Sequence, residues 1–368
     1  MQTTKGTRTE IKSSKEQTLN ALLNKLEQTH KLQACEYEWL IKNRTSEFAA
    51  KACTRAVFLR KQIYGNSVFI RGLIEVSNHC KNNCYYCGIR RGNASVKRYR
   101  LSHASVLECA KRGYEQGFRT FVLQAGEDAQ LTDSAVCEMV HAIKTTHPDC
   151  VVTLSLGERN AASYKRFYDA GARRYLLRHE SASEALYSRW HPHEMQLENR
   201  MQCLHDLRSV GFCVGAGFMV GAPYQTAKDI ACDLVFLQDF KPEMCGIGPF
   251  IPHCETPFAS FECGSASLTC FILSLVRIML PNVLLPATTA LNSVANDGAK
   301  QGILAGANVV MPNLTPEAQR KNYALYNNKK AFGSESAEGL ATLKAQMRRI
   351  GYKVVVDVGN VANNPKFL

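Results

Sequence analysis

Three cysteines with a C-x3-C-x2-C spacing, Cys80, Cys84 and Cys87, are the residues of this chain best placed to do chemistry. They directly follow an apolar, β-branched run that predicts a strand, so one short loop can gather three thiolates. Thiolates hold iron–sulfur clusters, and three protein ligands leave one coordination position open to chemistry. The alternatives are three unrelated thiols or a structural zinc completed by His79 or His103. Such a zinc site usually offers a second C-x2-C pair, which this sequence lacks. The spacing therefore predicts a cluster.

The composition indicates a globular chain in a reducing compartment. Its 368 residues are 45% hydrophobic, and no run of 18 apolar residues is present, so we expect no membrane partner. The fifteen cysteines are an odd number and mostly lie within apolar segments, where free thiols behave as small hydrophobes. Acidic residues interrupt the basic ones in Met1–Gln17, which argues against a transit peptide. We therefore expect a cytoplasmic protein.

The net charge of +13 raises the question of nucleic acid. The basic residues are scattered, and no aromatic-interleaved basic motif or recognition helix stands out, so we expect no nucleic-acid partner. A small anionic substrate or an acidic protein partner fits the charge as well.

Strand-like and helix-like segments alternate after a helical region that ends near Tyr64. The expected strands are Val68–Val76, Thr120–Ala125, Val151–Leu156, Arg174–Arg178, Cys213–Val220, Met244–Ile251, Leu285–Ala290 and Asn308–Met311. An amphipathic helical segment follows each of the first seven. This order predicts an α/β fold, a (β/α)8 TIM-type barrel. An open doubly wound sheet is the alternative, but no G-x-G-x-x-G turn follows the first strand.

Three regions follow from this reading. Residues 1–64 form an N-terminal helical segment packed on the barrel, residues 65–315 form the barrel, and residues 316–368 form a short C-terminal extension. Chemistry in such a barrel belongs to the C-terminal ends of the strands, where the three cysteines also lie.

Period-two alternation assigns polar side chains to the barrel interior near this mouth. They are Gln124 on the second strand, Thr153 and Ser155 on the third, and Arg178 and Glu180 on the fourth. The fifth strand adds the glycines Gly215, Gly217 and Gly221, and the seventh ends in Thr288 and Thr289. The sequence therefore predicts a polar ligand cavity. Alternatively, Arg178 and Glu180 form a structural ion pair, and the threonines, serine and glycines only serve packing.

The cysteine motif after a first barrel strand is typical of radical S-adenosylmethionine (SAM) enzymes, and other segments resemble one family among them. That family is HydE, the maturation enzymes of FeFe-hydrogenase, which are related to biotin synthase and methylornithine synthase. The segments are Ser77–Arg91, Leu123–Asp128, Thr153–Glu158, Arg174–Glu180, Gly246–His253, Pro286–Ala290 and Gly306–Asn313. The resemblance covers about residues 65–327.

The resemblance implies a mechanism and a set of site residues. Cys80, Cys84 and Cys87 would ligate three irons of a 4Fe–4S cluster, and SAM would bind the fourth iron and be cleaved to a 5'-deoxyadenosyl radical. The implied cofactor contacts are Tyr86, Glu127, Ser155, Glu180 and Arg200. Glu127 stands in an Ala-Gly-Glu where the superfamily has Gly-Gly-Glu. The implied substrate contacts are Gln124, Thr153, Arg178, Thr288 and Thr289, with Tyr323 or Tyr326 closing the cavity.

The resemblance also implies partners. The substrate would be a small anionic iron–cysteine species with CO and cyanide ligands, made by a HydG-like maturase. The product would feed the diiron subcluster of the hydrogenase (the H-cluster), with a HydF-like maturase and an electron donor as further partners. The compartment would be a hydrogenosome or another organelle if the source is eukaryotic. Some relatives carry three more cysteines near the C-terminus for a second cluster; here the last cysteine is Cys270, so we expect one cluster.

Three other readings are to be compared with this one. A methylornithine synthase needs only the same cluster and a polar cavity. A biotin synthase-like enzyme that inserts sulfur needs further barrel cysteines, for which Cys150, Cys213, Cys245 and Cys254 are available but not in the expected pattern. A non-catalytic zinc protein or electron carrier would need no polar cavity.

Overall fold

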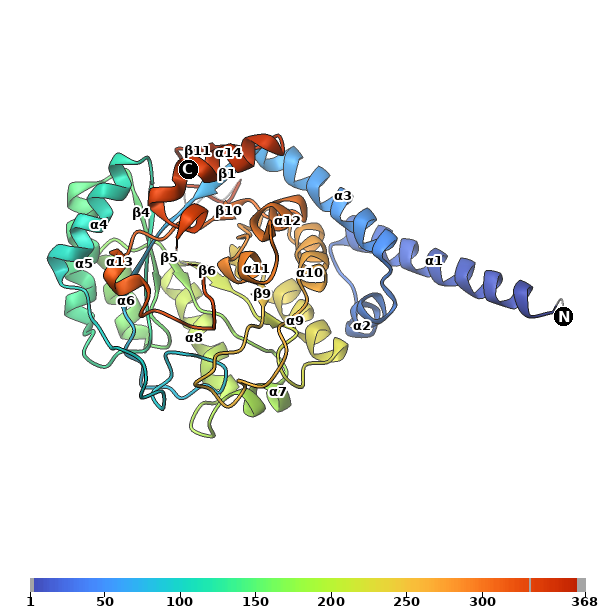
Figure 1. Cartoon of the computed structure of the whole chain (residues 1–368), viewed down its shortest axis with the longest axis horizontal. Helices are drawn as coiled ribbons and strands as arrows, with labels where there is room; N and C mark the ends of the chain where they lie inside the picture. The colour runs from blue at the N-terminus through green and yellow to red at the C-terminus, as the bar shows by residue number, and fades with distance from the viewer. Residues whose placement is uncertain (1–2, 331, 363–368) are drawn as a thin grey trace.

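Three helices precede the first strand in the computed structural model, which describes residues 3–330 and 332–362. They are α1 (Thr3–Thr29), α2 (Ala34–Asn43) and α3 (Ser46–Tyr64). The start of α1 extends away from the rest of the molecule (Figure 1). Apolar residues at helical spacing in its second half, such as Leu19, Leu23 and Leu26, are buried in a cluster shared with α3, α9 (Ala227–Phe240) and α10 (Ala266–Met279). The three helices thus have no separate core.

Parallel strands form the centre of the molecule (Figure 1). The first barrel strand is interrupted at Arg71 and consists of β1 (Ser67–Ile70) and β2 (Gly72–Ser77). The sheet runs in the order β2-β3-β4-β5-β6-β8, and β7 pairs with β9. The bounds are β3 Thr120–Ala125, β4 Val151–Ser155, β5 Arg174–Leu176, β6 Cys213–Ala216, β7 Met219–Val220, β8 Met244–Cys245, β9 Gly248–Pro249 and β10 Val309–Val310.

The barrel closes through a segment that is less regular than predicted. The expected seventh strand, Leu285–Ala290, is wrong: Leu284 and Pro286 make only single bridges, to Met244 and Val309. Pro286 has no N–H for a ladder. The Thr288 hydroxyl then accepts a bond from the Leu291 N–H and caps the next helix. Pairing of β10 with β1 completes the ring, so the predicted α/β barrel of the TIM type is confirmed, with single bridges at the position of its seventh strand.

Helices surround the strands, as the alternating pattern predicted (Figure 1). The remaining helices are α4 His103–Glu115, α5 Asp133–Thr146, α6 Ala161–Asp169, α7 Glu184–Trp190, α8 Leu197–Val210, α11 Thr289–Val294, α12 Gly298–Leu304, α13 Glu317–Arg320 and α14 Leu340–Arg349. Phe121, Leu123, Val152 and Leu154 are buried in the core between strands and helices. Thr153, on the opposite face of β4, is buried in the barrel interior, as alternation requires.

The segment from β11 (Lys353–Val355) to Asn360 covers the lower end of the barrel, which is the end where the strands begin. After α14, strand β11 pairs with β1. The buried Arg174 guanidinium donates to the carbonyls of Val358 and Gly359 at 3.0–3.1 Å and to the Asn360 Oδ1 at 2.7 Å. The sequence assigned no role to this tail, which nonetheless supplies the acceptors for a buried cation.

Replacing Arg174 with Met should lower the free energy of unfolding by about 3 kcal/mol. Several buried acceptors lose their donor at about 1–3 kcal/mol each, and relief of the arginine's own desolvation offsets part of that loss. Denaturant unfolding measures the change. The exposed neighbour Arg173, changed to Met, is the control and should cost less than about 1 kcal/mol. Equal losses in the two variants would contradict a specific role for Arg174.

Candidate active site at the cysteine loop and barrel mouth

The loop that carries the three cysteines has almost no regular structure, yet its backbone is held in place. The Arg98 guanidinium donates to four loop carbonyls, those of Asn78, Ile89, Arg90 and Asn93, at 2.5–3.2 Å. The fully buried Asn78 side chain bonds the backbone of Lys97, Tyr99 and Asn322. An irregular loop needs such partners because it has no ladder of its own. The positions of the cysteines are therefore set by a fixed frame.

The three thiols lie half-buried on this loop. Burial raises the pKa of each thiol, to about 12 for Cys87, and the neighbouring cysteines raise the pKa of Cys84 and Cys87 further. A thiol of raised pKa keeps its proton near neutral pH unless a metal replaces that proton, and the thiolate is the form that binds iron. The donor set therefore fits a cationic iron–sulfur group.

The zinc alternative requires three or four side chains that converge on one ion. Within residues 3–330 and 332–362, no three His, Cys, Asp or Glu side chains are grouped so that they could hold one metal ion, and His79 and His103 complete no such set. A 4Fe–4S cluster takes its thiolates on different irons, so its ligands need not meet at one point. That Cys80, Cys84 and Cys87 are the residues that ligate a cluster stays a prediction.

Tyr86 uses its hydroxyl within the protein. The buried His191 donates from Nδ1 to the Tyr187 carbonyl at 2.8 Å, so its Nε2 accepts from the Tyr86 hydroxyl at 3.1 Å. Burial lowers the pKa of His191 to about 3, which keeps the ring neutral and fixes these roles. The Tyr86 ring lies edge-on to Trp190 and His191. The hydroxyl proton of Tyr86 is therefore used within the protein, and its ring, its backbone and its hydroxyl oxygen as an acceptor are left for the predicted cofactor contact.

The predicted SAM contacts Glu127 and Arg200 lie in one charged network. The buried Arg200 guanidinium donates from Nε to Glu158 at 2.5 Å and from Nη1 to the Arg178 carbonyl at 2.8 Å. Its Nη2 lies 3.9 Å from the Glu127 carboxylate, which accepts the Glu158 N–H at 3.0 Å. Burial opposes the charge of Arg200, but Tyr187 and the two carboxylates raise its pKa well above the ordinary value. The guanidinium is thus charged and held in one orientation.

Glu180 and Arg178 face each other beside this network. The Arg178 Nη2 lies 3.1 Å from the Glu180 Oε2, although neither atom reaches hydrogen-bond geometry. The ion-pair alternative is thus observed, but it leaves both groups unsatisfied. Glu180 also has a left-handed backbone, with φ of 66°, which is uncommon for a residue with a side chain. Such strain is concentrated at functional sites because the surroundings must enforce it.

The predicted substrate contacts Gln124 and Thr153 share the barrel interior. The Gln124 Nε2 donates to the Tyr323 hydroxyl at 3.3 Å, and Tyr323 is fully buried. The Thr153 Oγ1 is buried and has no hydrogen-bond partner. Ser155 pairs with Gln124 across β3 and β4 and is partly exposed. A buried hydroxyl without a partner is costly, which points to a polar ligand at this position.

The predicted contacts Thr288 and Thr289 have partners of their own. Thr288 caps α11, and the Thr289 hydroxyl donates to the Glu335 carboxylate at 2.6 Å. The same carboxylate accepts from the Asn292 side chain at 2.8 Å. Burial raises the pKa of Glu335, and the bonds from Thr289 and Asn292 counteract part of that rise. The C-terminal extension therefore reaches the mouth of the barrel, beside the predicted substrate contacts.

The sequence analysis missed three charged residues at this mouth. Glu158 fixes Arg200, and the fully buried Glu75 on β2 pairs with Lys329 from the extension. A signal for Glu75 was available, because a lone carboxylate within an apolar strand needs a partner. Nothing in the local sequence of Lys329 indicates its partner.

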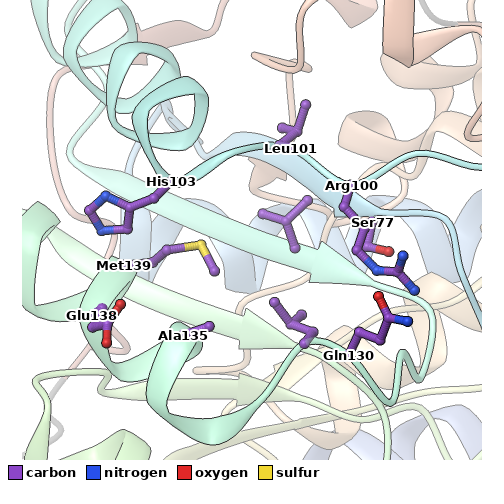
Figure 2. Close-up of a pocket in the computed structure, with 10 residues that line it drawn as sticks. Ser77, Arg100, Leu101, His103, Gln130, Ala135, Glu138 and Met139 are labelled. Atoms are coloured by element: carbon purple, nitrogen blue, oxygen red, sulfur yellow. The ribbon is translucent and has the colours of Figure 1, made fainter.

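A separate pocket of about 180 Å³ lies outside the barrel, between the end of β2 and helices α4 and α5 (Figure 2). On its wall, Arg100 makes two bonds to the Asp128 carboxylate, at 2.6 and 2.9 Å, and Ser77 donates to it at 2.7 Å. Burial alone would raise the pKa of Asp128, but these bonds lower it to about 2. These contacts join the segment around the cysteine loop to the loop after β3. Because the charged groups on this wall bond each other, we assign this pocket no ligand.

Comparison with known proteins places these features in a family. The sequence model of the radical SAM superfamily matches residues 74–236. The chain is 43% identical to the FeFe hydrogenase maturase subunit HydE of Thermotoga maritima, over 74% of this chain and 77% of that protein. It is 27% identical to the 3-methylornithine synthase of Methanosarcina barkeri, over 73% and 76%.

A crystal structure of methylornithine synthase (PylB) shares the fold. It superposes with a TM-score of 0.81 at 24% identity, over 91% of this chain and 97% of that one. The match to HydE is closer in sequence than this one, and the superfamily model covers the cysteine loop. The chain belongs to the HydE family of FeFe-hydrogenase maturases, within the radical SAM superfamily.

Proposed function

We propose that this protein is a radical SAM enzyme that takes part in building the diiron subcluster of an FeFe-hydrogenase. The observation that carries the proposal is the position of the three-cysteine loop at the barrel mouth, next to a network of fixed charges formed by Glu127, Glu158 and Arg200. We propose one 4Fe–4S cluster per chain, held by Cys80, Cys84 and Cys87. A reduced cluster, when bound, supplies one-electron cleavage of SAM to methionine and a 5'-deoxyadenosyl radical.

The charged network would hold the amino acid part of SAM. Arg200 is assigned to the SAM carboxylate, because a guanidinium fits a carboxylate fork, and Glu127 to the SAM ammonium. Glu158 acts through Arg200: its carboxylate fixes the guanidinium at Nε. Glu180, Ser155 and the ring of Tyr86 complete the proposed cofactor side.

The opposite part of the mouth would hold the substrate. The proposal assigns Arg178, Gln124, Thr153, Thr288 and Thr289 to a small anionic iron–cysteine species with CO and cyanide ligands. The unsatisfied Arg178 nitrogens and the unpartnered Thr153 hydroxyl support this assignment. Thr289 would have to share its hydroxyl with Glu335.

The sulfur-inserting alternative gains no support from two of the four cysteines considered for it. Of the cysteines considered for it, Cys245 packs in the core between strands and helices, and Cys254 is exposed after β9. The methylornithine synthase alternative differs from the proposed function in its substrate. An enzyme of that kind would act without any hydrogenase being matured.

The proposed partners are HydG-like and HydF-like maturases and an electron donor, in the cytoplasm or in a hydrogen-producing organelle. No helix in the described part of the chain has the length and apolar character needed to span a bilayer. Residues 77–102 around the cysteines contain six lysines and arginines and no acidic residue. This charge suits an acidic redox protein as the donor.

Reconstitution with iron and sulfide under anaerobic conditions tests the cluster. We expect about four irons and four sulfides per chain, as one 4Fe–4S cluster requires, and loss of bound iron in Cys84→Ala with an unchanged circular dichroism spectrum. Cys109→Ala, on α4, is the control and should keep its iron. About eight irons in the wild type, or full iron in Cys84→Ala, would refute the assignment.

Replacing Arg178 with Lys keeps the charge but removes the planar fork. In a maturation assay with an apo-hydrogenase and the other maturases, we expect at least a ~10-fold loss of hydrogenase activity, because one charged hydrogen bond is worth about 1.5–3 kcal/mol. SAM cleavage without substrate should stay at the wild-type rate. The exposed Arg173→Lys is the control. Full maturation by the Arg178 variant would remove this residue from the substrate site.

Charge reversal of Arg91 and Lys97 tests the electron-donor surface. SAM cleavage driven by dithionite should be unchanged, whereas cleavage driven by a reduced acidic ferredoxin should slow by ~10-fold at low salt, since rim charges govern association. High salt should remove the difference. The same charge change at Arg348 and Arg349 on α14 is the control. Equal rates with ferredoxin in both double variants would refute this surface.

A further inference from the structure

Residues 322–330, which we call the strap, cross the barrel mouth without regular secondary structure. Near the cysteine loop, the Asn322 carbonyl accepts from Asn78 at 2.7 Å and the Leu325 carbonyl accepts from Gly88 at 2.8 Å. Farther along, the Asn327 N–H donates to the Pro252 carbonyl and the Lys330 N–H to the Ser293 hydroxyl. The strap thus joins the cysteine loop to the opposite side of the mouth.

The close approach of the strap explains why a glycine follows Cys87. A Cβ atom at Gly88 would lie 2.2 Å from the Ala324 carbonyl oxygen and 2.3 Å from the His253 ring. Contacts of that length are sterically forbidden, so no other residue fits here while the strap is closed. The sequence of the cysteine loop is therefore matched to the strap above it.

One charged side chain of the strap enters the barrel. The Lys329 side chain is only 9% exposed, and its ammonium bonds the Glu75 carboxylate on β2, which is fully buried. The other Glu75 oxygen has no partner. The Lys329 ammonium also donates to the Tyr323 carbonyl at 2.9 Å and lies 4.8 Å from the centre of the Tyr323 ring. Tyr323 in turn bonds Gln124.

This pair acts on opening of the strap rather than on the fold as a whole. When the strap is closed, both charges are buried and each requires the other. When it is open, water solvates both, so the intact pair adds little net stability to either state. Removing one partner leaves an uncompensated buried charge in the closed state only, which favours the open state. Removing both charges takes that penalty away.

We propose that Lys329 is a positioning residue that compensates the buried charge of Glu75, so that the strap can close over the barrel mouth during turnover, and that the strap opens to admit substrate. The role in turnover rests on the proposed radical SAM function; the closure itself does not. Lys329 acts through Tyr323 and Gln124, and the closed strap keeps solvent and reductant away from the radical.

Hydrogen–deuterium exchange of the full chain with its reconstituted cluster tests the closure. In Lys329→Met and in Glu75→Gln, exchange in peptides covering residues 322–330 should accelerate by at least ~10-fold, the effect of leaving one buried charge unpaired. The double variant should return toward the wild-type rate, and Lys329→Arg should stay close to it. Lys321→Met, whose side chain is exposed just before the strap, is the control. Unchanged exchange in Lys329→Met, or faster exchange in the double variant than in either single one, would overturn the proposal.

The second readout is the coupling of SAM cleavage to maturation. The single variants should form several-fold more 5'-deoxyadenosine per hydrogenase matured than the wild type, and the double variant should recover. Wild-type coupling in a single variant with an open strap would refute the role in turnover. If the wild type forms no 5'-deoxyadenosine, the proposed function fails, whereas the exchange measurement still decides whether Lys329 closes the strap.

Discussion

Charges buried inside a closed barrel must find partners there, and this constraint organises the molecule from its lower end to its mouth. At the lower end, Arg174 takes its acceptors from the C-terminal tail. At the mouth, Arg200 is fixed by Glu158, and Glu75 requires Lys329 from the strap. Segments outside the barrel are therefore needed to satisfy residues inside it. The barrel and its extensions form one electrostatic unit.

Some polar groups beside this network have no hydrogen-bond partner in the described part of the protein. Arg178 faces Glu180 without hydrogen-bond geometry, and the Thr153 hydroxyl is buried without a partner. Charged groups near Arg178 and Thr153, such as Arg200, have hydrogen-bond partners within the described residues, whereas these two side chains have none. A bound polar ligand is the simplest partner for them. The Arg98 frame adds rigidity, since it holds the cysteine loop through backbone carbonyls alone. The cysteines are thus held in fixed positions beside polar groups that are free to bind a ligand. Such an arrangement suits a radical reaction, in which the reacting groups must be held in place.

The sequence predicted the barrel, the buried alternation of β3 and β4 and the position of the cysteine loop, because these depend on local periodicity and spacing. It overestimated the seventh strand, since Pro286 and the capping Thr288 end the extended run after single bridges. It missed the roles of the tail and the strap, since Lys329 lies 254 residues from Glu75. Pairing over such a distance leaves no local pattern. Spacing pointed to the three cysteines, and strand alternation placed polar residues such as Arg178 and Thr153 inside the barrel. The roles of the site residues toward SAM and substrate came from the family resemblance and stay predictions.

The proposed function requires that this barrel use its cysteine loop to cleave SAM reductively. The most direct measurement is the yield of 5'-deoxyadenosine when the reconstituted protein is incubated anaerobically with SAM and dithionite. We expect 5'-deoxyadenosine and methionine in equal amounts from the wild type and neither product from Cys84→Ala. A wild-type protein with a full cluster that forms no 5'-deoxyadenosine would contradict the proposed radical SAM function.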